Sequence, residues 1–348
     1  MILILGKQGI LHSLGNDIKN LFQNFFTMRG RWQREGDELL IHYSKDAPHA
    51  TNKRRMIVVM LDGKRKHGGL ADRLRGIVST YYVAKQLGYD FRIHFVHPFP
   101  LIDYLVPNTY DWRVSEEELC FNSDDAEPMF CGSQATHVEP KFQELWLRKR
   151  CKNAKKQLHV YTNAWILRHG PDYSRCFNEL FRPSEALQAA LDRQEAQFGR
   201  DYYAITLRFQ QLLGDFIEEP QFTVLAEGEA QQLMDQCIEQ IEKLHKKLND
   251  GRRFLVTSDS QRFLDYVSRQ LDYTYVVSGP LAHMDWSENI PFETNLKSFL
   301  DFYMIMHAHK AYLLQTGKMY NSGFPRRAAQ AGNIPFKLIR FGKLNGER

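Results

Sequence analysis

Polar side chains that follow predicted strands are the residues of this sequence best placed to do chemistry. The run Tyr202–Leu207 (YYAITL) is short and apolar, which predicts a buried strand, and Arg208 follows it directly. The planar guanidinium group of an arginine can hold a diphosphate at two points. The alternative for Arg208 is a structural ion pair with Asp215, Glu218 or Glu219. Both interpretations stay open from this stretch alone.

Two further segments place polar groups where a strand gives way to a helix. VTSD ends with Ser258 and Asp259, and Asp259 could accept a hydrogen bond from a base or ribose, or cap the next helix. NSGFPRRAAQAG offers Asn321 and Ser322 at a turn into a helix, which is a natural phosphate site. Because the carboxyl ends of parallel strands meet at one edge of a sheet, we expect these segments and Arg208 to converge.

A glycine pair forms a fourth candidate. In HGGLADRLRGI, Gly68 and Gly69 stand between a predicted strand and a predicted helix, so backbone N–H groups could face an anion or a sugar hydroxyl. The segment is not a Walker A loop, because no G-K-[S/T] follows, and it lacks the full dinucleotide fingerprint. Two glycines that simply make a tight turn are the alternative.

The elements that must position these residues fall into two α/β halves. MIVVMLDG predicts a strand, LRGIVSTYYVAKQLG a helix with Gly88 as its C-cap, and FRIHFVH a second strand, so a parallel sheet is expected. Strands and helices alternate again from Tyr202 onward. The pattern weakens between Pro98 and Pro183, where LHVYTNAW is a strand candidate and the acidic run SDDAEP is interpreted as a solvated loop.

The length of 348 residues, 43% of them hydrophobic, supports two domains with a cleft between them. We expect an N-terminal extension over residues 1–50 with a docking helix in LGNDIKNLFQNFF, and an α/β domain over residues 51–183. A connecting helix over residues 184–199, capped by Ser184, then leads to a C-terminal α/β domain over residues 200–348.

Composition excludes several classes of protein. The net charge of +5 does not imply a polyanion partner, and RKRCKNAKK carries no aromatic residues for stacking, so no nucleic-acid partner is expected. Five cysteines without a C-x-x-C pair favour a reducing compartment. The apolar start, MILIL, is too short for a signal peptide, and no later run reaches the length of a membrane span. We expect a soluble, cytoplasmic protein, and the sequence predicts no oligomeric state.

The order of the segments resembles the fucosyltransferase superfamily, which includes nodulation α-1,6-, α-1,2- and protein O-fucosyltransferases. The segments that support this resemblance span most of residues 56–340. In chain order they are GGLADRLRGIVSTYYVAKQLG, LRFQ, VTSD, DFYMIMHAHKAYLLQ and NSGFPRRAA. NSGF followed by Ala328 is the most specific match, close to the N-S-x-F-x-x-x-A pattern of the α-1,2 enzymes. The resemblance implies a GT-B fold with two Rossmann-like domains facing across a cleft. It also implies GDP-fucose as donor, inversion at the anomeric carbon, a glycan acceptor bound on the side of the N-terminal domain, and neither a cofactor nor an essential metal.

The resemblance also implies residue roles. Arg208 and Ser322 would hold the donor β-phosphate, and Asp259 would recognise guanine. Thr206 stands where the family often has histidine, and Phe209 replaces a second arginine. The candidate donor-binding residues are Gly68, Gly69, Arg73, Thr206, Arg208, Ser258, Asp259, Asn321 and Ser322.

For the catalytic step, the candidate residues are Arg208, Asp215 and Glu218. Asp215, Glu218 or Glu219 would be the general base that takes the proton of the acceptor hydroxyl. His307 and His309 are two residues apart and point to different faces of a helix, and no D-x-D triplet occurs, so no metal site is expected. Two alternatives remain: a GT-B transferase that uses another sugar nucleotide, and a non-catalytic glycan-binding member of the same family.

Overall fold

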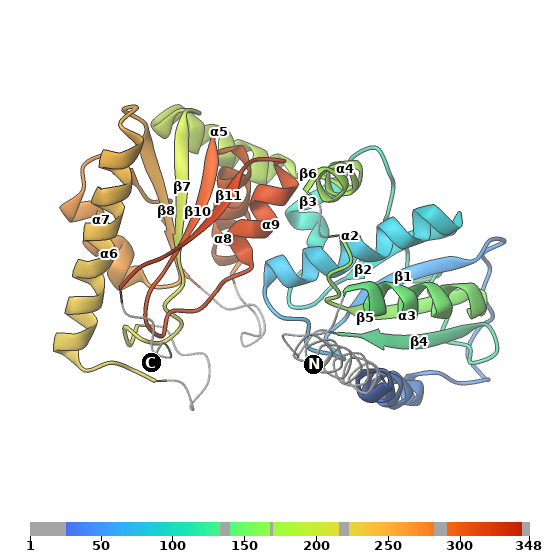
Figure 1. Cartoon of the computed structure of the whole chain (residues 1–348). Helices are drawn as coiled ribbons and strands as arrows, with labels where there is room; N and C mark the ends of the chain where they lie inside the picture. Colours follow the sequence, from blue (N-terminus) through green and yellow to red (C-terminus); the bar gives the residue numbers. More distant parts are fainter. Residues whose placement is uncertain (1–25, 133–139, 168–169, 216–222, 282–290, 343–348) are drawn as a thin grey trace, which may run out of the picture. The chain divides into compact units, whose positions relative to one another are not determined.

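The computed structural model describes residues 26–132, 140–167, 170–215, 223–281 and 291–342 (Figure 1). The chain divides into two compact units, and neither is one continuous stretch of sequence. The first unit draws on residues 1–67, 75–94 and 112–167, and the second on residues 68–74, 95–111 and 168–348. The domain boundaries expected at residues 50, 183 and 199 stay predictions.

The first unit is built on a four-stranded sheet in the order β2-β1-β5-β4. Strand β5 runs parallel to both β1 and β4, as expected for buried apolar strands joined by helices. Every residue of β1 and β5 is buried. The elements of this sheet and its helices are β1 (Met56–Leu61), α2 (Leu70–Leu87), β2 (Asp90–Phe95), β4 (Ala126–Cys131), α3 (Pro140–Asn153) and β5 (Gln157–Thr162). The predicted strand, helix and second strand of the first half are therefore confirmed.

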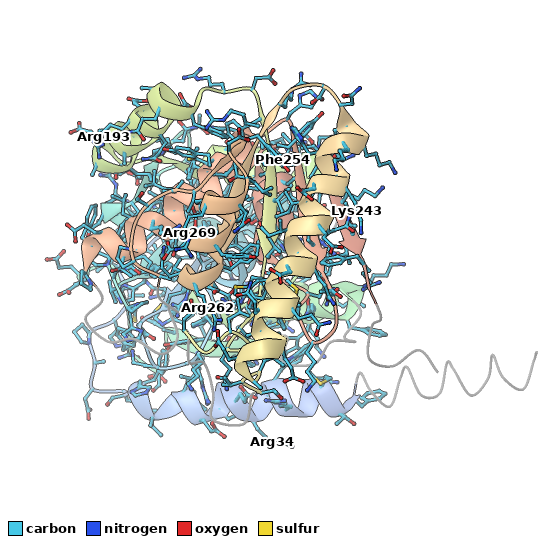
Figure 2. The ribbon with its side chains drawn as sticks, turned by 90° about the vertical axis from the view of Figure 1, so that its left-hand side faces the viewer. Arg34, Arg193, Lys243, Phe254, Arg262 and Arg269 are labelled. Carbon is cyan, nitrogen blue, oxygen red and sulfur yellow. The ribbon has the colours of Figure 1, made fainter. Side chains whose placement is uncertain are left out.

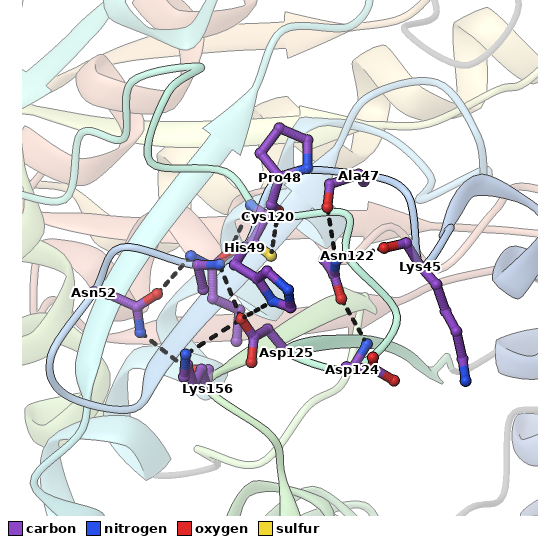
Figure 3. Close-up of polar contacts among 12 residues, drawn as sticks. Lys45, Ala47, Pro48, His49, Asn52, Cys120, Asn122, Asp124, Asp125 and Lys156 are labelled. Atoms are coloured by element: carbon purple, nitrogen blue, oxygen red, sulfur yellow. Dashed lines mark hydrogen bonds and ion pairs between the residues drawn. The ribbon is translucent and has the colours of Figure 1, made fainter.

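The structure corrects the interpretation of the acidic run SDDAEP. Its first residues form a turn, but Asp125 is buried and β4 begins at Ala126. The Oδ2 atom of Asp125 accepts from the backbone N–H of Ala50. It also pairs with His49 and Lys156, as Figure 3 shows. The prediction of a solvated loop is wrong because this carboxylate anchors the segment that precedes β1.

The second unit contains a five-stranded parallel sheet in the order β11-β10-β7-β8-β9. Helices α6 and α7 cover one face of this sheet, and α8 and α9 cover the other (Figure 1). The elements are β7 (Tyr202–Leu207), α6 (Glu227–Leu248), β8 (Arg253–Ser258), α7 (Gln261–Gln270), β9 (Thr274–Tyr275), α8 (Phe292–His307), β10 (Lys310–Gln315), α9 (Phe324–Ala331) and β11 (Phe336–Arg340). The alternation of strands and helices expected from Tyr202 onward is confirmed, and it continues to a further strand, β11, that the sequence did not predict.

The region where the sequence pattern weakened is divided between the units: residues 112–167 supply β4, α3 and β5 of the first unit, and its two ends form short elements of the second unit. The Ser184 hydroxyl caps α5 by accepting from the Leu187 N–H at 3.3 Å, as predicted. The Tyr104 ring stacks on Phe299 of α8, with ring centroids 4.6 Å apart. The remaining elements are η1 (Glu38–His42), η2 (Leu101–Asp103), β3 (Leu105–Pro107), α4 (Gly170–Leu180), β6 (Phe181–Pro183) and α5 (Glu185–Phe198).

Most of the predicted docking helix, LGNDIKNLFQNFF, lies outside the described residues, which begin at residue 26. Residues 26–37 are helical, and the buried indole of Trp32 donates to the Gly132 carbonyl at 2.8 Å. All five cysteines are buried and free of disulfide bonds. Across the described ranges, no helix combines the length and the apolar character that crossing a membrane requires.

Candidate functional site

The strand order of the second unit reverses between β7 and β10, and this is where open α/β sheets bind ligands. After β7 the chain continues to β8 on one side, whereas after β10 it continues to β11 on the other side. Arg208 follows β7, and the segment 316–323 follows β10. The backbone N–H of Tyr320 donates to the Arg208 carbonyl at 3.0 Å. The loops that carry Arg208 and Ser322 therefore meet at the carboxyl edge of the sheet.

Arg208 is held by the carboxylate of Asp259. Its Nη1 atom lies 3.0 Å from Asp259 Oδ2, and the Arg208 side chain keeps 19% of its surface exposed. Asp259 also accepts from the backbone N–H groups of Phe209, at 2.8 Å, and Gln210, at 2.6 Å. The ion-pair alternative for Arg208 is thus realised, with Asp259 rather than Asp215.

The environment of Asp259 opposes its ionisation. Burial raises the pKa of this carboxyl group, while the charge of Arg208 and the hydrogen bonds from the Phe209 and Gln210 backbone act in the other direction. Because these three groups engage both carboxylate oxygens, Asp259 fixes the loop that presents Arg208. Recognition of guanine by Asp259 stays a prediction.

The carboxylate of Asp215 packs against the first residues of α7. Its Oδ2 atom accepts from the Ser260 hydroxyl at 2.9 Å and from the Arg262 N–H at 2.8 Å. Ser260 is the N-cap of α7 and accepts from the Phe263 N–H at 3.1 Å, so the cap is Ser260 and not Asp259. Glu218 and Glu219, the other candidates for a general base, lie outside the described residues.

Ser322 lies just before the N-terminus of α9. Its hydroxyl oxygen accepts from the Phe324 N–H at 3.2 Å and its side chain is largely buried, whereas the neighbouring Asn321 is exposed. A serine hydroxyl that accepts one hydrogen bond still carries a proton that it can donate to an anion. Ser322 therefore has the chemistry of a phosphate ligand.

Thr206 and Ser258 lie at the ends of β7 and β8, close to Arg208. The hydroxyl groups of Thr206 and Thr257 are 2.7 Å apart and join the two strands, and both side chains are buried. The Ser258 hydroxyl accepts from the Ser260 N–H at 3.2 Å. These hydroxyl groups connect the strand ends that Arg208 and Asp259 directly follow.

The glycine pair forms a group of its own with Arg73. Gly68 has a φ of +82°, a backbone conformation that favours glycine. Arg73 is buried and donates from Nε to the Gly68 carbonyl at 2.8 Å and from Nη1 to the His97 carbonyl at 3.1 Å. Arg73 thus holds the glycine turn in place through the carbonyl of Gly68.

Phe209 and Tyr320 were not assigned to the site from the sequence. The Phe209 side chain points away from Arg208 into the core, where its ring centroid lies 4.9 Å from that of Phe263. A core position explains why no second cation follows Arg208 in this chain. Tyr320 contributes through its backbone N–H, and no sequence pattern marks such a contact.

No group of three or more His, Cys, Asp and Glu side chains that could hold a metal ion occurs within the described residues. The independence from metals and cofactors stays a prediction.

A doubly wound parallel sheet with an arginine and a serine at its reversal point, together with a second parallel sheet, defines a GT-B-like α/β fold. Solved fucosyltransferase structures share it. NodZ α-1,6-fucosyltransferase soaked with GDP-fucose superimposes with a TM-score of 0.53 at 15% identity, over 83% of this chain and 95% of that chain. NodZ from Bradyrhizobium gives 0.51 at 14% identity, over 80% and 92% of the two chains.

A variant of Arabidopsis thaliana FUT1 in complex with GDP gives a TM-score of 0.51 at 12% identity, over 92% of this chain and 78% of that chain. At these identities the likeness shows the fold, and the predicted fucosyltransferase-like fold is confirmed. No protein-family model and no curated protein matches the sequence.

Proposed function

We propose that this protein is an inverting glycosyltransferase that transfers fucose from GDP-fucose to a hydroxyl group of a glycan. The observation that carries the proposal is the joining of Arg208 to the loop of Ser322 by the Tyr320 N–H bond, at the reversal point of the sheet. The shared fold supports the choice of donor, because NodZ was solved with GDP-fucose and the FUT1 variant with GDP. The proposed location is the cytoplasm.

In the proposed reaction, the acceptor oxygen attacks C1 of fucose from the face opposite GDP, and the bond between C1 and the phosphate oxygen breaks. GDP leaves with the bonding electrons, so negative charge develops on its β-phosphate. Arg208 and Ser322 would stabilise that charge, and one such donor contributes about 10²–10³ in rate. The acceptor proton would pass to Asp215, Glu218 or Glu219.

Thermal unfolding with nucleotides tests the donor. We expect GDP and GDP-fucose to raise the melting temperature and UDP-sugars to leave it unchanged, because a ligand at 100 times its Kd adds about 2.7 kcal/mol to the stability. If no guanine nucleotide stabilises the protein, the donor assignment is wrong. A hydrolysis panel of sugar nucleotides then separates GDP-fucose from other donors.

Arg208→Lys tests the role of the guanidinium group in turnover. Lysine keeps a positive charge beside Asp259 but lacks the two-point fork, so we expect kcat to fall by about 10²-fold. The melting temperature should stay close to that of the wild type. Arg262→Lys is a matched control, because Arg262 pairs with Glu227 at the start of α6. Equal activity of the two variants would remove Arg208 from the mechanism.

A non-catalytic glycan-binding protein of the same fold is the second candidate. The observation that favours it concerns the charge at this strand end. Arg208 is already paired with the carboxylate of Asp259, and the next residue, Phe209, lies in the core and supplies no second cation. Glycan binding without hydrolysis or transfer from any sugar nucleotide would support this candidate against the transferase.

A further inference from the structure

A groove on the second unit gathers positive charge, and none of the candidate site residues lines it. It lies between α6 and the strands β10 and β11, and has a volume of about 500 Å³. Figure 2 shows Lys243 on α6, which lines it. None of the described residues lining this basic groove is acidic, and five are cations: Lys243, Lys247, Lys310, Lys337 and Arg340.

Local interactions account for some of the individual cations that line the groove. They do not explain why five cations line it together. Lys243 lies 3.4 Å from Glu239, but both side chains are about two-thirds exposed, and such pairs contribute little. Lys247 lies in the last turn of α6, where the helix dipole favours a positive charge. Lys310 lies 5.3 Å from the centroid of the Tyr312 ring. Cations that converge from a helix and two strands repel one another unless an anion lies between them.

The floor of the groove indicates which kind of anion fits. Leu244 and Ile339 provide apolar surface beside the cations, which suits the C–H faces of sugar rings. The aromatic residue that lines the groove, Tyr312, is only 2% exposed and offers no ring on which a nucleic-acid base could stack. From Gln240 to Leu248 the groove follows α6 for about 12 Å, so it can hold an extended chain.

We propose that the basic groove binds an acidic saccharide chain that carries carboxylate, sulfate or phosphate groups. As a statement about the acceptor, the inference rests on the proposed glycosyltransferase function. The small net charge of the chain conceals such a site, because the cations gather on one surface while acidic residues lie elsewhere.

Binding of fluorescent oligosaccharides to the full-length protein tests the proposal. The probes are a heparin-derived oligosaccharide and an oligogalacturonate, with a neutral dextran oligosaccharide, single-stranded DNA and phosphatidylserine-containing vesicles for comparison. We expect the acidic saccharides to bind with an affinity that falls as salt rises, and dextran not to bind. Combining Lys243→Gln, Lys337→Gln and Arg340→Gln should weaken saccharide binding by about tenfold or more.

A matched control removes the same amount of charge from other surfaces of the second unit. Arg193, Lys246 and Arg269 are exposed and do not line the groove, and Figure 2 labels the two arginines. Changing all three to Gln should leave saccharide affinity within about twofold of the wild type, because contact with the anion and not net charge determines binding.

Three outcomes would overturn the proposal: no binding of acidic saccharides, equal losses in the two triple variants, or tighter binding of DNA or vesicles at the same salt concentration. The melting shift with GDP separates this inference from the proposed function. A groove variant that loses saccharide binding and keeps its GDP shift supports the groove. Saccharide binding that depends on the groove in a protein without any GDP shift also supports the groove, and rejects the donor.

Discussion

Asp259 shows how a residue at a strand end can act through its neighbours. Its carboxylate holds the guanidinium group of Arg208 and two backbone N–H groups of the loop after β7. A buried carboxylate is stable only when its charge and both oxygens are engaged. The position of Arg208 therefore depends on Asp259, whichever ligand the site binds.

Asp259→Asn should destabilise the protein by about 3 kcal/mol, because the change leaves Arg208 without its buried counter-charge and turns an amide N–H₂ toward a backbone donor. Urea unfolding measures the loss. Asp265→Asn is the control: Asp265 is exposed and accepts from Gln261 on the same helix, so its effect should stay within about 0.5 kcal/mol. Similar losses in both variants would contradict this account.

His159 predicts a pH dependence in the first unit. It is fully buried between the Tyr43 hydroxyl, 2.6 Å from Nδ1, and Gln157 Oε1, 3.1 Å from Nε2. Burial lowers the pKa of His159 from 6.5 to about 3, although the nearby charge of Asp62 opposes this shift. The unfolded chain therefore binds a proton below pH 6.5 that the folded protein does not bind.

Stability should accordingly fall as the pH drops from about 6.5 toward 3, by up to about 1.4 kcal/mol per pH unit from this one group. Urea unfolding between pH 7 and 5 measures the slope. In His159→Gln, an amide can replace the ring in both hydrogen bonds and does not titrate, so the slope should be smaller. Parallel slopes for the two proteins would show that His159 does not control this dependence.

At the scale of elements, the turn into α2 requires one of its two glycines much more than the other. A Cβ atom on Gly68 would lie 2.7 Å from the Asp72 carboxylate, and the φ of +82° disfavours any other residue. Nothing lies within 4 Å of a Cβ atom on Gly69. What this turn requires is the positive φ at Gly68, and not the presence of two glycines.

Gly68→Ala should therefore cost about 1–2 kcal/mol in stability, while Gly69→Ala should cost little because its added methyl group enters open space. Thermal unfolding of the two variants side by side gives the comparison. The prediction fails if Gly69→Ala is the more damaging change.

The sequence predicts the buried strand β7 and even the edge strand β2, but it misses the edge strands β4 and β11. Strand β7 is a continuous apolar run, whereas β11 carries Lys337 and Arg340 among its five residues and is half-exposed. Strand β4 contains Pro128, which an edge position tolerates because no neighbouring strand needs its N–H on that side.

The sequence likewise predicts only part of the candidate site. Chain order places Arg208 and Ser322 at strand ends, and the parallel sheet then brings their loops together. The bonds from Phe209 and Gln210 to Asp259 depend on the tertiary distance between two loops, which no local pattern contains.

At the scale of the whole molecule, the second unit is not a continuous piece of chain. Residues 95–111 belong to it, and within them Tyr104 is buried and stacks on Phe299, while the Asp103 carbonyl accepts from the Ser184 hydroxyl at 2.7 Å. Strand β3 from the same segment pairs with β6. The second unit thus obtains part of its core from a distant stretch of sequence.

A fragment of residues 168–348 should therefore unfold at a lower temperature than one in which residues 95–111 are joined to it by a Gly-Ser linker. Loss of the Tyr104 ring alone removes about 2–3 kcal/mol of apolar burial. Circular dichroism melts of both fragments test this. Identical melting curves would mean that the segment contributes nothing to the stability of the second unit.

The hydrogen bond from the Tyr320 N–H to the Arg208 carbonyl has a practical use in spectroscopy. Its proton exchanges with solvent only when the loops after β7 and β10 separate, so its exchange rate measures how often this edge of the sheet opens. One assigned amide resonance in the isotope-labelled protein would then report on nucleotide binding at the site without a labelled ligand and without any knowledge of the acceptor.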